Sequence, residues 1–195
     1  MAQDRVSISG GLRTDVNSFT EQGDDPLKTL SARMGISYML ADKWSLNASV
    51  GDYYKLPAYT ILSYRTNTGN LINRIADYTR SGHFVIGTEF LPAPTTRFTL
   101  EGFYKRYDRV PVSIRDGISL SNLGGDFTVV GNEPVRTNGK GYSYGFEFFA
   151  QQKLSQRFFG TLSYTYFISR FSGSDAKMIA SAWDNRHLLS FIGGY

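Results

Sequence analysis

The sequence predicts an all-β fold, an antiparallel meander of about eight strands. Three observations support this prediction. Apolar and polar residues alternate with a period of two, which places them on opposite faces of a strand. The connections between the alternating runs are short and long in turn. Aromatic residues reach 15% of the 195 residues and charged residues only 19%, which suits a sheet with one unusually apolar face. Together these features are typical of strands from a transmembrane β-barrel.

Two runs in the first third of the chain predict the first hairpin. In the run 30–40, the even positions hold Leu, Ala, Met, Ile, Tyr and Leu, while the odd positions hold Ser, Arg, Gly, Ser and Met. The run 44–50 continues in the same way, with Trp, Leu, Ala and Val at its even positions. Because only residues 41–43 separate the runs, we expect a tight turn and a hairpin with one apolar and one polar face.

Six further runs alternate in the same way and bring the expected number of strands to about eight. The last of them is the weakest, because Leu188 and Ile192 occupy positions of its polar face. The six runs lie at 5–13, 83–90, 97–105, 142–148, 161–168 and 186–195.

The lengths of the connections indicate how the strands are oriented. A transmembrane barrel has short turns at its periplasmic rim and longer loops at its outer rim, whereas a soluble sandwich has no reason to sort its connections by length. We therefore expect the apolar face to contact outer-membrane lipid and the polar face to line a wet lumen. The expected short turns are 41–43, 92–95 and 155–156, and the expected long connections are 20–28, 58–76, 114–140 and 173–185.

Aromatic residues gather near the ends of the expected strands. Amphipathic rings settle at the depth of lipid headgroups and form girdles around outer-membrane barrels. No run approaches the about 20 apolar residues of a membrane-spanning helix. The sequence therefore predicts a protein of the bacterial outer membrane. The aromatic residues concerned are Trp44, Tyr53, Tyr54, Phe90, Phe98, Phe158, Phe159 and Tyr195.

The sequence offers little raw material for catalysis. It contains no Cys and only two histidines, His83 and His187, so most catalytic triads and metal sites lack their usual residues. His187 would open the last strand, where a hydrogen-bonded structural histidine is the simpler interpretation. The net charge of +4 is scattered along the chain, which argues against a nucleic-acid partner. We expect no enzyme activity, no cofactor and no metal site.

Four segments, 26–64, 96–127, 144–173 and 181–195, carry a resemblance to a known family. Their most specific parts are a strand with the sequence GFY at 102–104 and a loop end with the sequence WDNRH at 183–187. These segments resemble the barrel region of TonB-dependent outer-membrane receptors of the Bacteroidetes type. The resemblance implies a barrel of about 22 strands with a plugged lumen. Such receptors import a scarce nutrient (a siderophore, haem, cobalamin or a glycan) with energy passed from TonB.

The resemblance does not extend to the plug domain, the TonB box or the opening strands of such a barrel. We therefore expect residues 1–195 to form a single segment of a partial outer-membrane barrel. The plug and TonB would then be partners only of the full-length parent protein.

Two alternatives remain open at this point. One is a complete eight-stranded outer-membrane barrel with an adhesin or anchoring role, in which the first and last strands would pair. The other is a soluble lipocalin-like barrel that binds a ligand, which would turn its apolar residues inward.

Substrate contacts are expected in the long loops rather than in the strand bodies, because loops on a rigid scaffold commonly carry binding function. The loop 114–140 is the richest candidate. For each single residue, ordinary solvated loop polarity is the competing interpretation. The candidate contacts to a small nutrient ligand are Arg115, Asp116, Asn122, Asp126, Asn132, Glu133 and Arg136.

Overall fold

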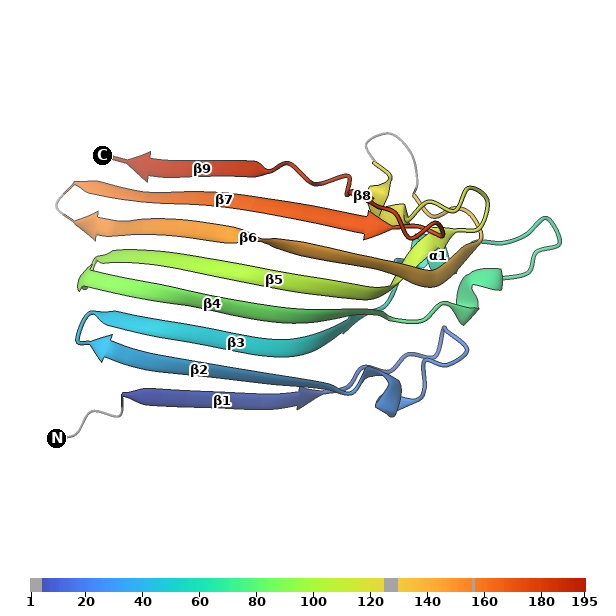
Figure 1. Cartoon of the computed structure of the whole chain (residues 1–195), viewed down its shortest axis with the longest axis horizontal. Coiled ribbons are helices and arrows are strands. Elements are labelled where there is room, and N and C mark those ends of the chain that lie inside the picture. Colours follow the sequence, from blue (N-terminus) through green and yellow to red (C-terminus); the bar gives the residue numbers. More distant parts are fainter. Residues whose placement is uncertain (1–4, 125–129, 156) are drawn as a thin grey trace.

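The chain folds into one antiparallel sheet whose strands follow each other in sequence order, with β9 beside β7 (Figure 1). The computed structural model describes residues 5–124, 130–155 and 157–195. The all-β meander predicted from the sequence is confirmed. The strands are β1 (Val6–Arg13), β2 (Ser31–Ala41), β3 (Trp44–Lys55), β4 (Thr79–Ala93), β5 (Thr96–Ser113), β6 (Val135–Ser155), β7 (Phe158–Ser172), β8 (Met178–Ala180) and β9 (His187–Gly194).

Short helices lie in the connections between strands. The first of them begins at Pro26, whose fixed φ suits the first helical position, and the Asp25 carboxylate accepts the free N–H of Leu27 at 2.9 Å. No helix in the described part of the chain is long and apolar enough to cross a membrane. The helices are η1 (Pro26–Thr29), α1 (Tyr59–Leu62), η2 (Ile72–Ile75) and η3 (Leu120–Asn122).

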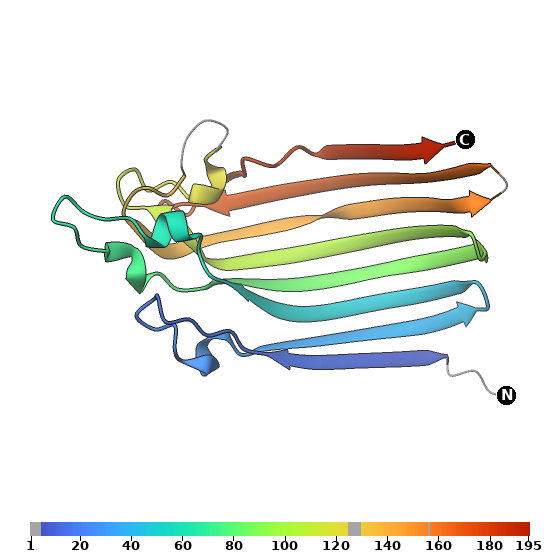
Figure 2. The ribbon, with the colours of Figure 1, turned by 180° about the vertical axis from the view of Figure 1, so that it is seen from behind.

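Short turns and long loops lie at opposite ends of the sheet, as the connection lengths predict (Figures 1 and 2). β2 and β3 are joined by residues 42–43, and β4 and β5 by residues 94–95, whereas the helices all lie at the other end. Strand β1 begins and β9 ends at the short-turn end. Within the described residues, β1 pairs with β2 alone and β9 with β7 alone, so the sheet is open at both edges.

One face of the sheet is apolar and exposed. Ile86 of β4 lies in register with Ala48 of β3 and is 54% exposed, and Leu100 of β5, one row away, is 48% exposed. A soluble monomer rarely exposes contiguous apolar surface of this kind. We call this side the outward face and the opposite, more polar side the inner face.

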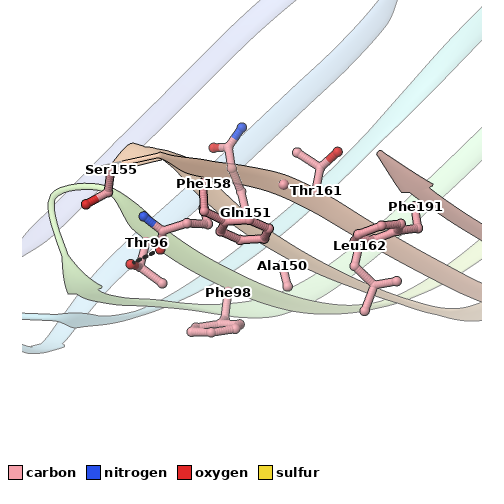
Figure 3. A pocket seen from close by; sticks show the side chains of 11 residues that line it. Thr96, Phe98, Ala150, Gln151, Ser155, Phe158, Thr161, Leu162 and Phe191 are labelled. Atoms are coloured by element: carbon pink, nitrogen blue, oxygen red, sulfur yellow. Dashed lines mark hydrogen bonds between the residues drawn. The ribbon is translucent and has the colours of Figure 1, made fainter. Parts of the chain in front are cut away.

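An aromatic girdle marks the short-turn rim of the outward face. Trp44, Phe90 and Phe98 lie in register on three neighbouring strands, and successive ring centroids are 5.3 and 6.5 Å apart. Figure 3 shows the adjoining strands from close by, where Phe98 and Leu162 project from one side of the sheet and Gln151 from the other. The alternation read from the sequence is therefore the alternation of side chains in space.

The strands extend farther toward the long loops than the sequence predicts. β3 continues to Lys55, and β6 already begins at Val135. The prediction that the loop 114–140 extends to residue 140 is therefore wrong, because its last six residues belong to β6. The period-two signal ends where outward positions become polar, whereas the backbone ladder continues. β8 forms a ninth strand inside the expected connection 173–185, and three residues are too few to produce a readable pattern.

Candidate functional site

The long loops pack against each other around a small apolar cluster. Ile61 of α1, Leu120 of η3 and Val135 of β6 are buried there, and Leu123 and Val130 pack against them. We call these five residues the loop core. It fixes the loop 56–78 and the loop residues 114–124 and 130–134 to the start of β6, away from the middle of the single-layered sheet.

Asn73 of η2 ties the same loops together by hydrogen bonds, and its side chain is only 1% exposed. The amide nitrogen donates to the carbonyl oxygens of Ile61 at 2.7 Å and Glu133 at 2.8 Å. The amide oxygen accepts from the backbone N–H of Val135 at 3.0 Å. Because both N–H groups and one acceptor position of the amide are satisfied, the buried side chain stabilises one arrangement of the loops.

Three of the candidate contacts lie around Ser113, the last residue of β5. The Ser113 hydroxyl donates to the Glu133 carboxylate and accepts from the backbone N–H of Arg115 at 3.1 Å. The Asp116 carboxylate accepts from the backbone N–H of Ile118 at 3.0 Å, which forms an Asx turn. Both carboxylates therefore hold the shape of the loop in this structure.

Arg115 and Asn122 reach toward other segments. The Arg115 guanidinium lies 3.3 Å from the Tyr64 hydroxyl and 5.9 Å from the centroid of its ring. The Asn122 amide donates to the carbonyl oxygens of Ile179 at 3.1 Å and Ala180 at 2.8 Å. Asn122 thus anchors η3 to β8, whereas Arg115 stays on the exposed surface beside the neighbouring loop.

The remaining candidates lie apart from these contacts. Arg136 is exposed but belongs to β6, where it lies opposite Val112, and is not the loop residue that the sequence predicts. Asn132 is exposed in the loop just before β6. Asp126 lies outside the described residues.

Aromatic and charged side chains line the inner face. The Arg33 guanidinium lies 4.1 Å from the centroid of the Tyr53 ring, which stacks on the His83 ring at a centroid distance of 4.3 Å. His83 lies opposite Lys105, and its Nε2 is 2.7 Å from the Ser81 hydroxyl. Half-buried rings and cations of this kind can contact the aromatic or anionic groups of a ligand or of another domain through their free surfaces.

A hollow in the inner face lies beside two carboxylates. Glu101 of β5 and Glu147 of β6 are direct partners across the ladder, and both line the hollow together with Lys105 and Trp183. Trp183 packs edge-on against Phe171 with ring centroids 5.6 Å apart. Like charges directly opposite each other destabilise a sheet, so this position favours a hydrogen-bond donor or cation. Across the part of the chain that the structure describes, no three acidic or histidine side chains are grouped to hold a metal ion.

The sequence predicts no role for Trp183 of the inner-face hollow or for Asn73 of the loops. Trp183 stands in the segment 183–187, which carries a family resemblance but no pattern that predicts its contacts. Asn73 has no local signal, because its partners include residues 60 and 62 positions farther along the chain.

A second hollow lies on the outward face among Phe98, Phe158, Leu162 and Phe191 (Figure 3). It opens near the short turns, at the other end of the strands from the loop core. We therefore do not assign it to a ligand that arrives through the long loops.

The fold is similar to that of solved outer-membrane receptors. The pyoverdine outer membrane receptor FpvA from Pseudomonas aeruginosa PAO1, bound to pyoverdine, matches with a TM-score of 0.64 and 17% identity over 98% of this chain and 26% of that chain. The siderophore receptor PirA from Pseudomonas aeruginosa matches with a TM-score of 0.59 and 18% identity, over 99% of this chain and 35% of that chain. The alcaligin outer membrane receptor FauA from Bordetella pertussis matches with a TM-score of 0.54 and 16% identity, over 84% of this chain and 26% of that chain.

These identities establish the fold alone, and the chain spans about a quarter to a third of the length of these three receptors. A comparison with curated protein sequences gives no match. The family model described as "TonB dependent receptor-like, beta-barrel" matches residues 2–191. The outward apolar face, the girdle and the sorted connections agree with this match, and the chain belongs to this family of bacterial outer-membrane receptors.

Proposed function

We propose that residues 1–195 form part of the barrel wall of a TonB-dependent receptor that imports a scarce nutrient. The observation that carries the proposal is the open sheet, whose edge strands β1 and β9 each have one partner among the described residues. A sheet edge cannot face lipid, because unpaired backbone groups find no water there. Further strands of a larger barrel would satisfy both edges. The plug and TonB are then partners of the whole receptor.

The loops suggest the chemistry of the nutrient. Arg115 and Arg136 are exposed, whereas Asp116, Asn122 and Glu133 make contacts that stabilise the loop. We therefore propose that the exposed cations contact an anionic group of the ligand. Such a contact suits a siderophore, haem or an acidic glycan better than it suits a neutral nutrient. The receptor type proposed from the sequence, that of the Bacteroidetes, is compatible with all of these ligands.

Uptake by the full-length receptor tests this function. Cells that express it should accumulate labelled ferric siderophore, haem, cobalamin or glycan in a TonB-dependent manner, and one of these in preference to the others. Arg115→Gln combined with Arg136→Gln should weaken uptake of that nutrient about tenfold or more, because a charge-assisted hydrogen bond contributes about 1.5–3 kcal/mol. Arg157→Gln at the short-turn end is the control. Uptake that is indifferent to TonB would contradict the proposed import function, and uptake unaffected by the double variant would contradict the proposed ligand contacts of Arg115 and Arg136.

A further inference from the structure

The outward face changes in character close to the long loops. Its last uncharged row consists of Val50, Phe84, Tyr104, Tyr144 and Ile168, which lie in register on β3 to β7. Two rows with charged residues follow toward the loops. We call their charged members the outer charged rim: Asp52, Arg106 and Arg170 in the first row, and Arg80, Asp108 and Lys140 in the second.

The outer charged rim holds four cations and two carboxylates, and the carboxylates are already paired. Arg80 Nη2 lies 2.8 Å from Asp52 Oδ2, and Arg106 Nε lies 3.4 Å from Asp108 Oδ2. Among the described residues, the remaining two cations, Lys140 and Arg170, form no ion pair within 4.0 Å.

Lys140 and Arg170 are placed to act together. Lys140 lies opposite Ser172, two residues beyond Arg170 on β7, so the two cations are diagonal neighbours on one face of a strand pair. Diagonal neighbours are about 7–8 Å apart, which is within reach of two long side chains that share one anionic group. Tyr142, directly opposite Arg170, adds an amphipathic ring at the same level.

The Arg170 side chain also has an unused donor. Its Nε is shielded from solvent, and no hydrogen-bond acceptor contacts it within the described part of the chain. A buried donor without a partner is unfavourable, and a rotamer that brings the guanidinium out to an anionic acceptor would remove that cost. The four ion-paired side chains of the rim, by contrast, all have partners and are 28–64% exposed.

We propose that the outer charged rim binds the phosphate groups of an anionic lipid in the outer leaflet, with Lys140 and Arg170 as the main contacts. The rim faces away from the lumen, so a nutrient on its way through the barrel would not meet it. It lies where the uncharged band ends, which is the level of lipid headgroups. Lysine and arginine are the side chains that bind phosphate.

A lipid rather than a free anion is favoured by the surface directly beneath the rim. Phe84 is 50% exposed, Tyr104 47% and Tyr144 42%, so acyl chains can cover these rings while the phosphates contact the cations. With the long loops outside, the outer leaflet supplies this ligand as a phosphorylated glycolipid, lipopolysaccharide. The proposal goes beyond nutrient import and does not depend on which nutrient is carried.

Lipopolysaccharide binding to the full-length receptor in detergent tests the proposal. The double variant Lys140→Gln/Arg170→Gln should bind about thirtyfold more weakly, since each cation near an anionic lipid surface contributes about a fivefold change. The matched control is Lys153→Gln/Arg157→Gln, which removes one Lys and one Arg from the opposite end of the same hairpin. The control should bind with an affinity within about twofold of that of the unmodified receptor, because surface substitutions away from a binding site have small effects. Lys140→Arg/Arg170→Lys should keep most of the affinity.

Three outcomes would overturn the proposal. The first is equal binding by the double variant and its control. The second is unchanged affinity for lipopolysaccharide whose phosphates have been removed. The third is full competition by inorganic phosphate at matched phosphate concentration, which would indicate a simple anion site. If the double variant does not fold, as judged by heat-dependent gel mobility, the exposed single change Lys140→Gln provides the test, with an expected loss of about fivefold.

Discussion

Replacing Ala48 by Arg is expected to destabilise the receptor, because it places a charge in the middle of the outward face. Along β3 the outward positions are uncharged from Trp44 to Val50, and Asp52 is the first charged one. At about 3.3 Å per residue, Trp44 and Asp52 are about 26 Å apart along the strand, or about 20 Å along the membrane normal at a tilt of about 40°. Ala48 lies halfway between them, at mid-depth.

An Arg that faces lipid at mid-depth costs about 2–4 kcal/mol, and Ala48→Arg should lower the free energy of unfolding by that amount. Asn47→Arg is the matched control, since Asn47 is the adjacent residue and points to the inner face. There the guanidinium stays in contact with water, and the expected change is about 0.5 kcal/mol or less. Val50→Arg should lower the free energy of unfolding by an amount between those two values, because a long side chain can extend to the nearby headgroups.

The assay is urea unfolding of the receptor in lipid vesicles, followed by tryptophan fluorescence. The midpoint should shift strongly for Ala48→Arg and little for Asn47→Arg, with the slope unchanged so that the shift reports stability. Equal losses for both variants, or a larger loss for Asn47→Arg, would show that the two faces have been assigned wrongly.

Asn73→Ala removes three hydrogen bonds from a buried position and should destabilise the loop arrangement by about 2–3 kcal/mol. Backbone amides near the loop core should then exchange hydrogen faster, whereas strand amides should not. Asn70→Ala, on the exposed part of the same loop, should leave hydrogen exchange unchanged. Gly145→Ala should disrupt the β6–β7 ladder, because its Cβ would lie 2.0 Å from a carbonyl oxygen of β7, whereas Gly11→Ala meets no atom within 4 Å; equal thermal midpoints would refute this. The 195-residue chain by itself should associate in detergent through its open edges, and a monodisperse monomer with β1–β9 hydrogen bonds would support a complete small barrel instead.

The sequence predicts the membrane-facing part of the fold well, because lipid and lumen impose opposite demands on successive residues. The run 44–50 shows this directly, since its successive side chains face lipid and water in turn. Beyond the bilayer both faces are wet, so the continuation of β3 to Lys55 leaves no period in the sequence. The sequence predicts edge strand β9 correctly in spite of Leu188 and Ile192, because the other positions of the strand keep the alternation.

The loops are harder to predict, for a physical reason. Of the candidate contacts, Glu133 satisfies a hydroxyl at the end of β5 and Asn122 satisfies carbonyl groups of β8, and their polarity alone could not reveal those partners. Asn73 depends on residues about 60 positions away in sequence. A pattern of local residue types predicts exposure and periodicity, whereas these contacts depend on how loops from different hairpins meet.

The length of β6 sets how far this part of the barrel wall extends into the medium. From Lys140 at the outer charged rim, the strand continues outward by five residues to Val135 of the loop core. Five residues span about 17 Å, or about 13 Å above the headgroups at a tilt of about 40°. The sugar chains of neighbouring glycolipids would surround the sides of this extension and leave only its top uncovered. A dissolved ligand would therefore meet the loops from above, along the barrel axis, before it could reach any lipid.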